Sequence, residues 1–117
     1  VIEKNNLIIG DNIKIYDSLP YLDFLHMMRD SKVVFTDSGG IQEETTALEI
    51  PCYTLRENTE RPITVSQGTN NLVGTDKENI LNIFRQKKFT IKDDYKIPFG
   101  WDGKAAERIH TILNKII

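Results

Sequence analysis

The chain has 117 residues, of which 39% are hydrophobic and 27% charged, a composition that suits one soluble globular domain. A formal net charge of −2 argues against a nucleic-acid binder or a membrane-surface binder, because either would present a basic face. No apolar run reaches the roughly 18 residues of a membrane helix. The lone Cys52 can form no internal disulfide, so a reducing compartment such as the cytoplasm is expected.

The first half of the chain alternates between short apolar runs and helical spacing. A β-prone run over 13–16 leads through turn residues to a predicted helix over 21–29. The side chains expected to face inward from this helix are Leu22, Phe24, Leu25 and Met28. The apolar run over 32–36 is typical of a strand covered on both faces, and a helix over 38–49 is expected to follow it.

The second half repeats the alternation. We expect a strand over 52–55, a helix from Pro62 to about Gly68, a short strand over 71–73, and a helix capped by Asp76. The last predicted helix carries an apolar stripe, which must lie against an apolar surface; its members are Ala105, Ile109, Ile112 and Ile116. This pattern predicts an α/β fold with a parallel sheet and helices on both faces. Ligands bind such sheets beyond the carboxyl ends of the strands.

The loop after the 32–36 strand is the first candidate site. In Ser38-Gly39-Gly40, the glycines allow backbone amides close to a ligand, and the helix start supplies unpaired N–H groups with partial positive charge. These features suit a phosphate. Glu44, about one turn into the helix, could accept hydrogen bonds from a ribose diol. An ordinary capped helix with a solvated Glu44 explains the same residues.

The loop after the 52–55 strand supplies the candidate counter-charge. Arg61 precedes a proline and could reach a diphosphate with its forked guanidinium, and Arg56 is a second candidate. The alternative is a surface cluster of ion pairs; its members would be Arg56, Glu57, Glu60 and Arg61.

Other reactive side chains are interpreted as structural. Cys52 lies in a predicted buried strand, and neither His26 nor His110 has a partner at metal-ligand spacing. Tyr21 or Phe24 could stack on a base, although core packing is the commoner use of an aromatic ring. These residues thus predict binding rather than catalysis, with no metal site in this chain.

Several motifs in the same order resemble the non-hydrolysing UDP-N-acetylglucosamine 2-epimerases. They are Thr36-Asp37-Ser38-Gly39-Gly40-Ile41-Gln42-Glu43-Glu44, Thr59-Glu60-Arg61-Pro62, Gly68-Thr69, Leu72-Val73-Gly74-Thr75-Asp76 and Pro98-Phe99-Gly100-Trp101-Asp102-Gly103-Lys104-Ala105. The resemblance runs from about Ile13 onward. It implies a fold like that of B-type glycosyltransferases, with two Rossmann-like domains, of which 1–117 resembles the second, UDP-binding one. The chain begins at Val1, so we expect it to be part of a longer protein.

The resemblance also implies roles for residues. Ser38, Gly39 and Gly40 would hold the diphosphate, Glu44 the ribose, and Arg61 the nucleotide, with Phe24 beside the uracil. The family interconverts UDP-N-acetylglucosamine and UDP-N-acetylmannosamine by eliminating UDP and adding it back. The proton-transfer groups belong to an N-terminal catalytic domain, so the resemblance implies that no catalytic residue belongs to this chain. It also implies no cofactor, and a homodimer is the expected assembly.

Three alternatives share parts of this pattern. Another UDP-sugar epimerase or a B-type glycosyltransferase would have a similar nucleotide half. A free-standing nucleotide-binding module would need no activity. A receiver-like signalling domain has a similar size, but it requires an acidic pair after its first strand, and the sequence offers only Asp17 there.

Overall fold

The computed structural model describes residues 5 and 7–117, which form one small sheet flanked by helices. The elements in chain order are α1 (Tyr21–Arg29), β1 (Val34–Thr36), α2 (Gly39–Ala47), β2 (Cys52–Thr54), α3 (Pro62–Ser66), β3 (Asn70–Leu72), α4 (Lys77–Gln86) and α5 (Ala105–Ile116). Most of the predicted elements are therefore confirmed, within a few residues at their ends.

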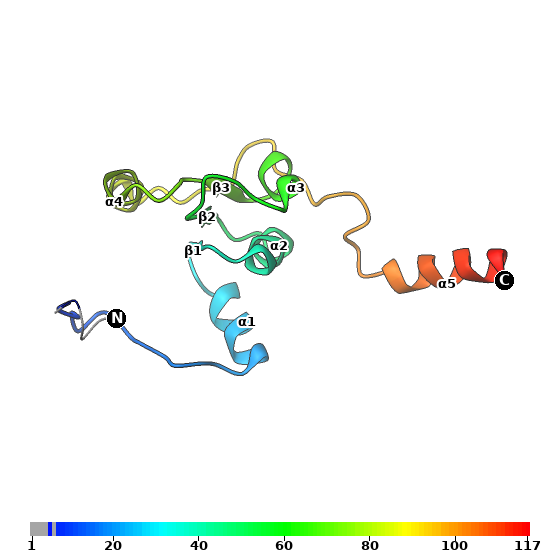
Figure 1. The fold of residues 1–117 in the computed structure, drawn as a ribbon, viewed down its shortest axis with the longest axis horizontal. Helices are drawn as coiled ribbons and strands as arrows, with labels where there is room; N and C mark the ends of the chain where they lie inside the picture. The colour runs from blue at the N-terminus through cyan, green and yellow to red at the C-terminus, as the bar shows by residue number, and fades with distance from the viewer. Residues whose placement is uncertain (1–4, 6) are drawn as a thin grey trace.

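The sheet is parallel and has the order β1-β2-β3 (Figure 1). Val34 pairs with Cys52, and Cys52 pairs with Asn70, so the first residues of the three strands lie in one row. Helices contact both faces: α2 and α3 contact the strands on one side, while Phe84 of α4 reaches the ring of Phe35 on the other. The predicted fold class is confirmed.

The face under α4 is aromatic. Phe35 and Tyr53 are side by side in β1 and β2 and stack with ring centroids 5.3 Å apart. Phe84 and Phe89 complete the cluster, at 6.1 and 6.2 Å from Phe35. Such ring pairs contribute about 0.5–1.5 kcal/mol beyond the area they bury.

The face under α2 and α3 is polar. Apart from prolines, Met28 and Cys52 are the only buried hydrophobic side chains among the described residues. The polar side chains buried with them are Thr36, Gln42, Thr45, Thr46, Thr54, Thr64, Thr69 and Asn70. A buried polar side chain costs free energy unless it is hydrogen-bonded, so this layer depends on its internal bonds.

The predicted strand over 13–16 is wrong. The segment is irregular, and Ile13, Ile15 and Tyr16 are each more than half exposed. A β-prone run becomes a strand only when it pairs with a neighbouring strand, and residues 13–16 pair with none of β1, β2 and β3, although the described sheet has free outer edges at β1 and β3. Leu22 is also exposed, against the expectation that it faces inward, whereas Met28 is buried as expected.

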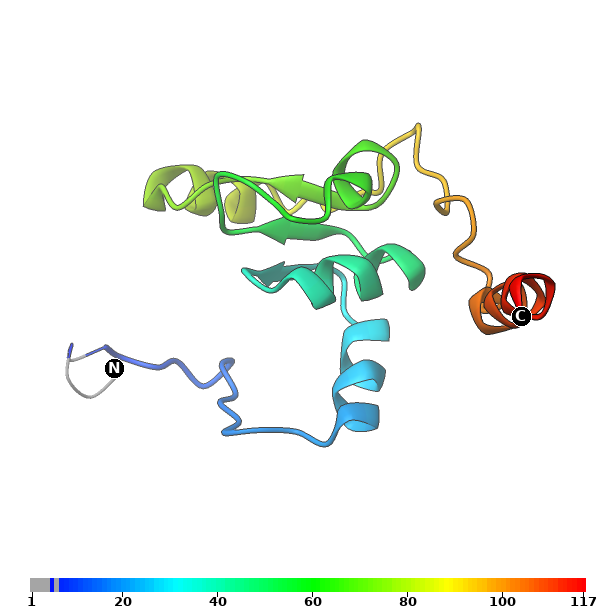
Figure 2. The ribbon, with the colours of Figure 1, turned by 45° about the vertical axis from the view of Figure 1, so that its right-hand side comes forward.

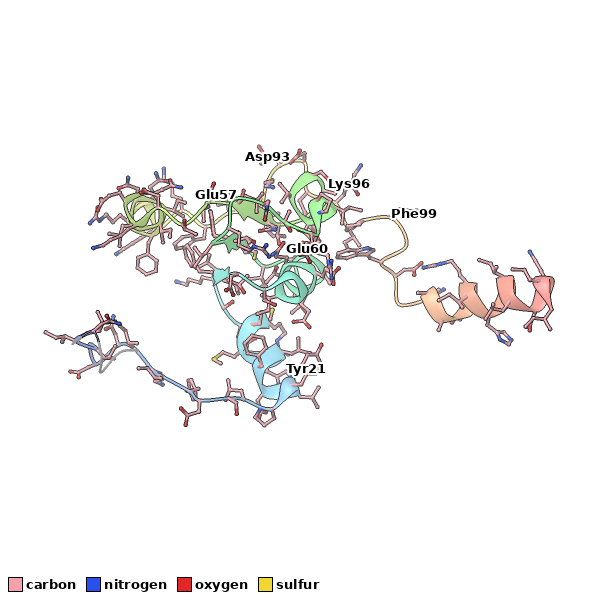
Figure 3. All side chains as sticks on the ribbon, in the orientation of Figure 1. Tyr21, Glu57, Glu60, Asp93, Lys96 and Phe99 are labelled. Carbon is pink, nitrogen blue, oxygen red and sulfur yellow. The ribbon has the colours of Figure 1, made fainter. Side chains whose placement is uncertain are left out.

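α5 lies apart from the sheet, at the far end of a connecting segment that carries Phe99 (Figures 1, 2 and 3). Its predicted stripe has no cover among the described residues: Ile109 and Ile112 are each 56% exposed. The Cα radius of gyration is 17.5 Å, larger than the roughly 13 Å of a compact domain of similar length. No helix in the described part of the chain is long and apolar enough to cross a membrane.

Candidate functional site

The loop between β1 and α2 leaves the start of α2 open. Ser38 stands at the N-cap position in an extended conformation, and its N–H donates to Thr36 Oγ1 at 3.1 Å. Its hydroxyl makes no capping hydrogen bond within the described structure. The first-turn N–H groups of α2 therefore keep their capacity to bind an anion, and the simple capped-helix alternative loses support.

Arg61 lies over the first glycine of this helix. A Cβ added to Gly39 would stand 3.8 Å from Arg61 Cγ, while a Cβ added to Gly40 would meet no protein atom within 4 Å. The two loops that the sequence singled out are thus neighbours, with open space above Gly40. This arrangement brings one guanidinium to the positive end of one helix.

Glu43 holds the guanidinium in this structure. Arg61 Nε lies 2.7 Å from Glu43 Oε1, and the two side chains are 42% and 43% exposed. The N–H does not point along this contact, because Nε has no aligned hydrogen-bond partner in the described structure. We therefore describe the contact as an ion pair, which at this exposure is worth at most about 1 kcal/mol. A ligand anion could replace it.

The alternative interpretation of the second loop, a surface cluster of ion pairs, is wrong. No ion pair among the described residues joins Arg56, Glu57, Glu60 and Arg61 to one another. Arg61 instead pairs with α2, and Arg56 donates to Asn58 Oδ1 at 3.3 Å. A partner 18 positions earlier in the chain carries no sequence signal, so this contact could not be predicted.

Glu44 lies one turn into α2 and is held by α1. The Tyr21 hydroxyl donates to Glu44 Oε1 at 3.1 Å, and this bond raises the pKa of Tyr21 above its ordinary value. Figure 3 places Tyr21 at the start of α1, and the contact joins residues 23 positions apart. The sequence suggested base stacking or core packing for Tyr21, and not a hydrogen bond to Glu44. Oriented through one oxygen, the carboxylate keeps its second oxygen for another donor.

Phe24 belongs to a neighbouring hollow rather than to the Gly39–Arg61 group. It is half-buried and lines a cavity of about 340 Å³; the other lining residues are Tyr16, Asp17, Ser18, Leu19 and Met27. Trp101 reaches α2 from the distant connecting segment and lines a cavity of about 360 Å³ with Glu43 and Glu44. The side of α2 that carries Glu44 is bordered by Tyr21 and Trp101, whereas no residue of α2 lines the hollow beside Phe24.

The remaining reactive groups lie elsewhere. Cys52 is fully buried, and burial raises the pKa of its thiol, as expected for a core residue. His110 shares a hydrogen bond with Asn114 on α5, and His26 borders a cavity of about 310 Å³ between α1 and α2. Among the described residues, no group of three or more histidine, cysteine or acidic side chains is placed to hold a metal ion.

Comparison with known proteins gives one consistent result. The sequence model of the UDP-N-acetylglucosamine 2-epimerase family matches residues 1–114. The UDP-N-acetylglucosamine 2-epimerase of Methanocaldococcus jannaschii is 46% identical over 101 residues, which cover 86% of this chain and 27% of the relative. That of Bacillus subtilis is 41% identical and covers 86% of this chain and 27% of its own length.

Solved structures agree. The chain superposes on the M. jannaschii UDP-GlcNAc 2-epimerase in complex with UDP-GlcNAc and UDP with a TM-score of 0.72 and 39% identity, covering 97% of this chain and 32% of that one. For the S. aureus MnaA–UDP co-structure the TM-score is 0.80 at 33% identity, with coverages of 92% and 30%. The chain thus spans less than a third of these relatives' length.

Proposed function

We propose that this chain, which belongs to the UDP-N-acetylglucosamine 2-epimerase family, is the UDP-binding half of an enzyme that interconverts UDP-N-acetylglucosamine and UDP-N-acetylmannosamine. Membership in this family excludes the receiver-like alternative. Relatives with bound UDP or UDP-GlcNAc favour a uridine diphosphate sugar as the ligand.

One observation carries the proposal: Arg61 stands over the glycine start of α2, and Glu44 lies one turn along the same helix. We assign the diphosphate to the Ser38 hydroxyl and the N–H groups of Gly39 and Gly40, together with the Arg61 guanidinium. Glu44, oriented by Tyr21, would accept the hydroxyls of the ribose. The hollow beside Phe24 would take the uracil, with its ring against the base.

The proposed chemistry uses UDP as a leaving group. Loss of the C2 proton and of UDP from C1 gives a glycal, and re-addition of both with the proton on the opposite face inverts C2. Negative charge builds on the diphosphate as the C1–O bond breaks. Arg61 and the start of α2 would stabilise that charge, which is an electrostatic contribution to the rate. We assign no proton transfer to this chain.

A binding measurement tests the assignment of Arg61. In the complete protein that carries this chain, Arg61→Ala should weaken UDP binding roughly 10- to 100-fold, because it removes charge-assisted hydrogen bonds worth about 1.5–3 kcal/mol. Isothermal titration calorimetry gives the affinities, and proton NMR follows epimerisation. An Arg61→Ala protein with unchanged UDP affinity would show that the diphosphate lies elsewhere.

The chain alone is proposed to bind UDP weakly and to be inactive, because the proton-transfer groups would come from an N-terminal catalytic domain. Turnover of UDP-N-acetylglucosamine by the isolated chain would contradict this. We also propose a homodimer in a reducing compartment, the cytoplasm, where the free Cys52 thiol is stable. Sedimentation analysis of the complete protein tests the assembly.

A further inference from the structure

We infer that a buried amide–hydroxyl network centred on Gln42 and Asn70 positions Arg61 for the ligand diphosphate, with Thr59 and Thr64 as the two side chains that hold its backbone. The inference rests on the proposed function, because it assigns a purpose to the geometry of Arg61. These four are positioning residues and are not expected to touch the ligand.

Both polar groups of the Arg61 peptide backbone are held by threonine hydroxyls. The Arg61 N–H donates to Thr59 Oγ1 at 2.9 Å, and the Arg61 carbonyl accepts from Thr64 Oγ1 at 2.7 Å. The backbone of this residue is therefore fixed from both sides, directly before α3 begins at Pro62. The side chain leaves from a defined point beside Gly39.

The two hydroxyls converge on one pair of amides. Thr59 Oγ1 donates to Gln42 Oε1 at 2.5 Å, and Asn70 Nδ2 donates to the same oxygen and to Thr64 Oγ1, each at 3.0 Å. The two threonine hydroxyls and the Asn70 amide N–H groups each meet an acceptor. Because Gln42 lies on α2 and Asn70 on β3, the circuit ties the Arg61 loop to the helix that begins at the anion site.

The sheet anchors the far end of the circuit. Thr54 Oγ1 of β2 donates to Asn70 Oδ1 at 2.5 Å. Gln42, Thr54, Thr64 and Asn70 are each at most 1% exposed. Because these side chains are shielded from water, a polar group that lost its partner here would stay unpaired at a high cost in free energy. This cost favours one arrangement of donors and acceptors.

The network is not built for stability alone. Gln42 Nε2 is buried and has no partner among the described residues, so this amide is retained despite an unsatisfied donor. An apolar side chain of similar size would avoid that cost. Gln42 Oε1 accepts hydrogen bonds from both Thr59 and Asn70. Because Thr59 also accepts from the Arg61 N–H, this shared acceptor fixes the position of the Arg61 backbone.

The test compares Thr59→Val with Thr59→Ser in the complete protein. Valine keeps the shape of threonine and removes the hydroxyl, whereas serine keeps the hydroxyl. We expect Thr59→Val to weaken UDP affinity roughly 10-fold or more through loss of Arg61 alignment, and Thr59→Ser to stay near wild type. Uridine, which has no phosphate, should bind all three proteins equally. Calorimetry with the two ligands gives both comparisons.

Thr45→Val is the matched control. Thr45 is as buried as Thr64, whereas Thr59 is half-buried, but the Thr45 hydroxyl donates to Ile41 O within α2. Its UDP affinity should equal that of wild type. Thr64→Val tests the carbonyl arm, so the inference stays testable if Thr59→Val fails to fold. In an Arg61→Ala background, Thr59→Val should cause no further loss of UDP affinity.

The outcomes separate the inference from the proposed function. Equal losses for UDP and uridine would show that the network is only structural and would overturn the inference. An unchanged UDP affinity in folded Thr59→Val, with a loss in Arg61→Ala, would overturn the inference and keep the proposed function. No loss in Arg61→Ala would overturn both.

Discussion

Gly40→Ala separates ligand binding from folding at the proposed site. Gly40 is the second residue of α2, and a Cβ added there meets no protein atom within 4 Å. In a helix the Cβ tilts toward the N-terminus, which here is the side where the diphosphate is proposed to lie. The only group that a methyl at this position should meet is the ligand.

The two expected effects have opposite signs. Alanine is the better helix former, so Gly40→Ala should leave the free energy of unfolding unchanged or raise it by up to about 1 kcal/mol. A methyl between the helix N–H groups and the phosphate should break one charge-assisted hydrogen bond, worth about 1.5–3 kcal/mol. UDP affinity should then fall roughly 10- to 100-fold.

Urea unfolding without ligand and calorimetry with UDP measure the two effects on the same preparation of the complete protein. Uridine serves as the control ligand and should bind Gly40→Ala as it binds wild type. If Gly40→Ala binds UDP normally, the diphosphate does not approach this turn, and the reasoning from the open space is wrong. A large loss of stability would show that Gly40 is covered by part of the protein outside this chain.

Two further predictions concern the core and need no ligand. Gly68→Ala should destabilise the fold by about 1–3 kcal/mol or more, because the new Cβ would stand 2.6 Å from Thr64 O and clash with the Thr46 side chain. Urea unfolding measures this loss, and an unchanged free energy of unfolding would contradict the packing of α3 against α2. Burial raises the pKa of the Cys52 thiol above its ordinary value, so the stability that depends on the neutral thiol is fully present below the unfolded-state pKa and is lost as the pH rises through the folded-state pKa. Iodoacetamide at pH 8 should therefore modify Cys52 only under unfolding conditions, and rapid labelling of the folded protein would contradict this burial.

Local sequence patterns were enough to locate most elements. The helix over 21–29, the Asp76 cap and the helix over 105–116 were predicted from spacing and capping chemistry. Asp76 Oδ2 accepts from the Asn79 N–H at 2.9 Å, as an N-cap should. These features succeed because a helix is stabilised by residues three or four positions apart.

The failures all involve groups distant in sequence. The run over 13–16 has strand propensity, but it does not pair with the described sheet, and local propensity alone does not bring a segment to a sheet edge. The stripe of α5 is amphipathic as predicted and yet uncovered, because a helical pattern shows which face is apolar and not what covers it. The chain spans less than a third of its relatives' length, and long-range packing depends on parts that a local pattern does not describe.

The sequence by itself determined the parts of the candidate site: a glycine turn at a helix start, a carboxylate one turn along it, and an arginine before a proline. Only the tertiary structure decided that Arg61 stands over Gly39 and pairs with Glu43, that Tyr21 holds Glu44, and that Gln42 and Asn70 fix the Arg61 loop. Residue type and local spacing determine which hydrogen bonds a group can make. Which partner it meets across 17 to 28 positions of chain is decided by how the strands and helices pack.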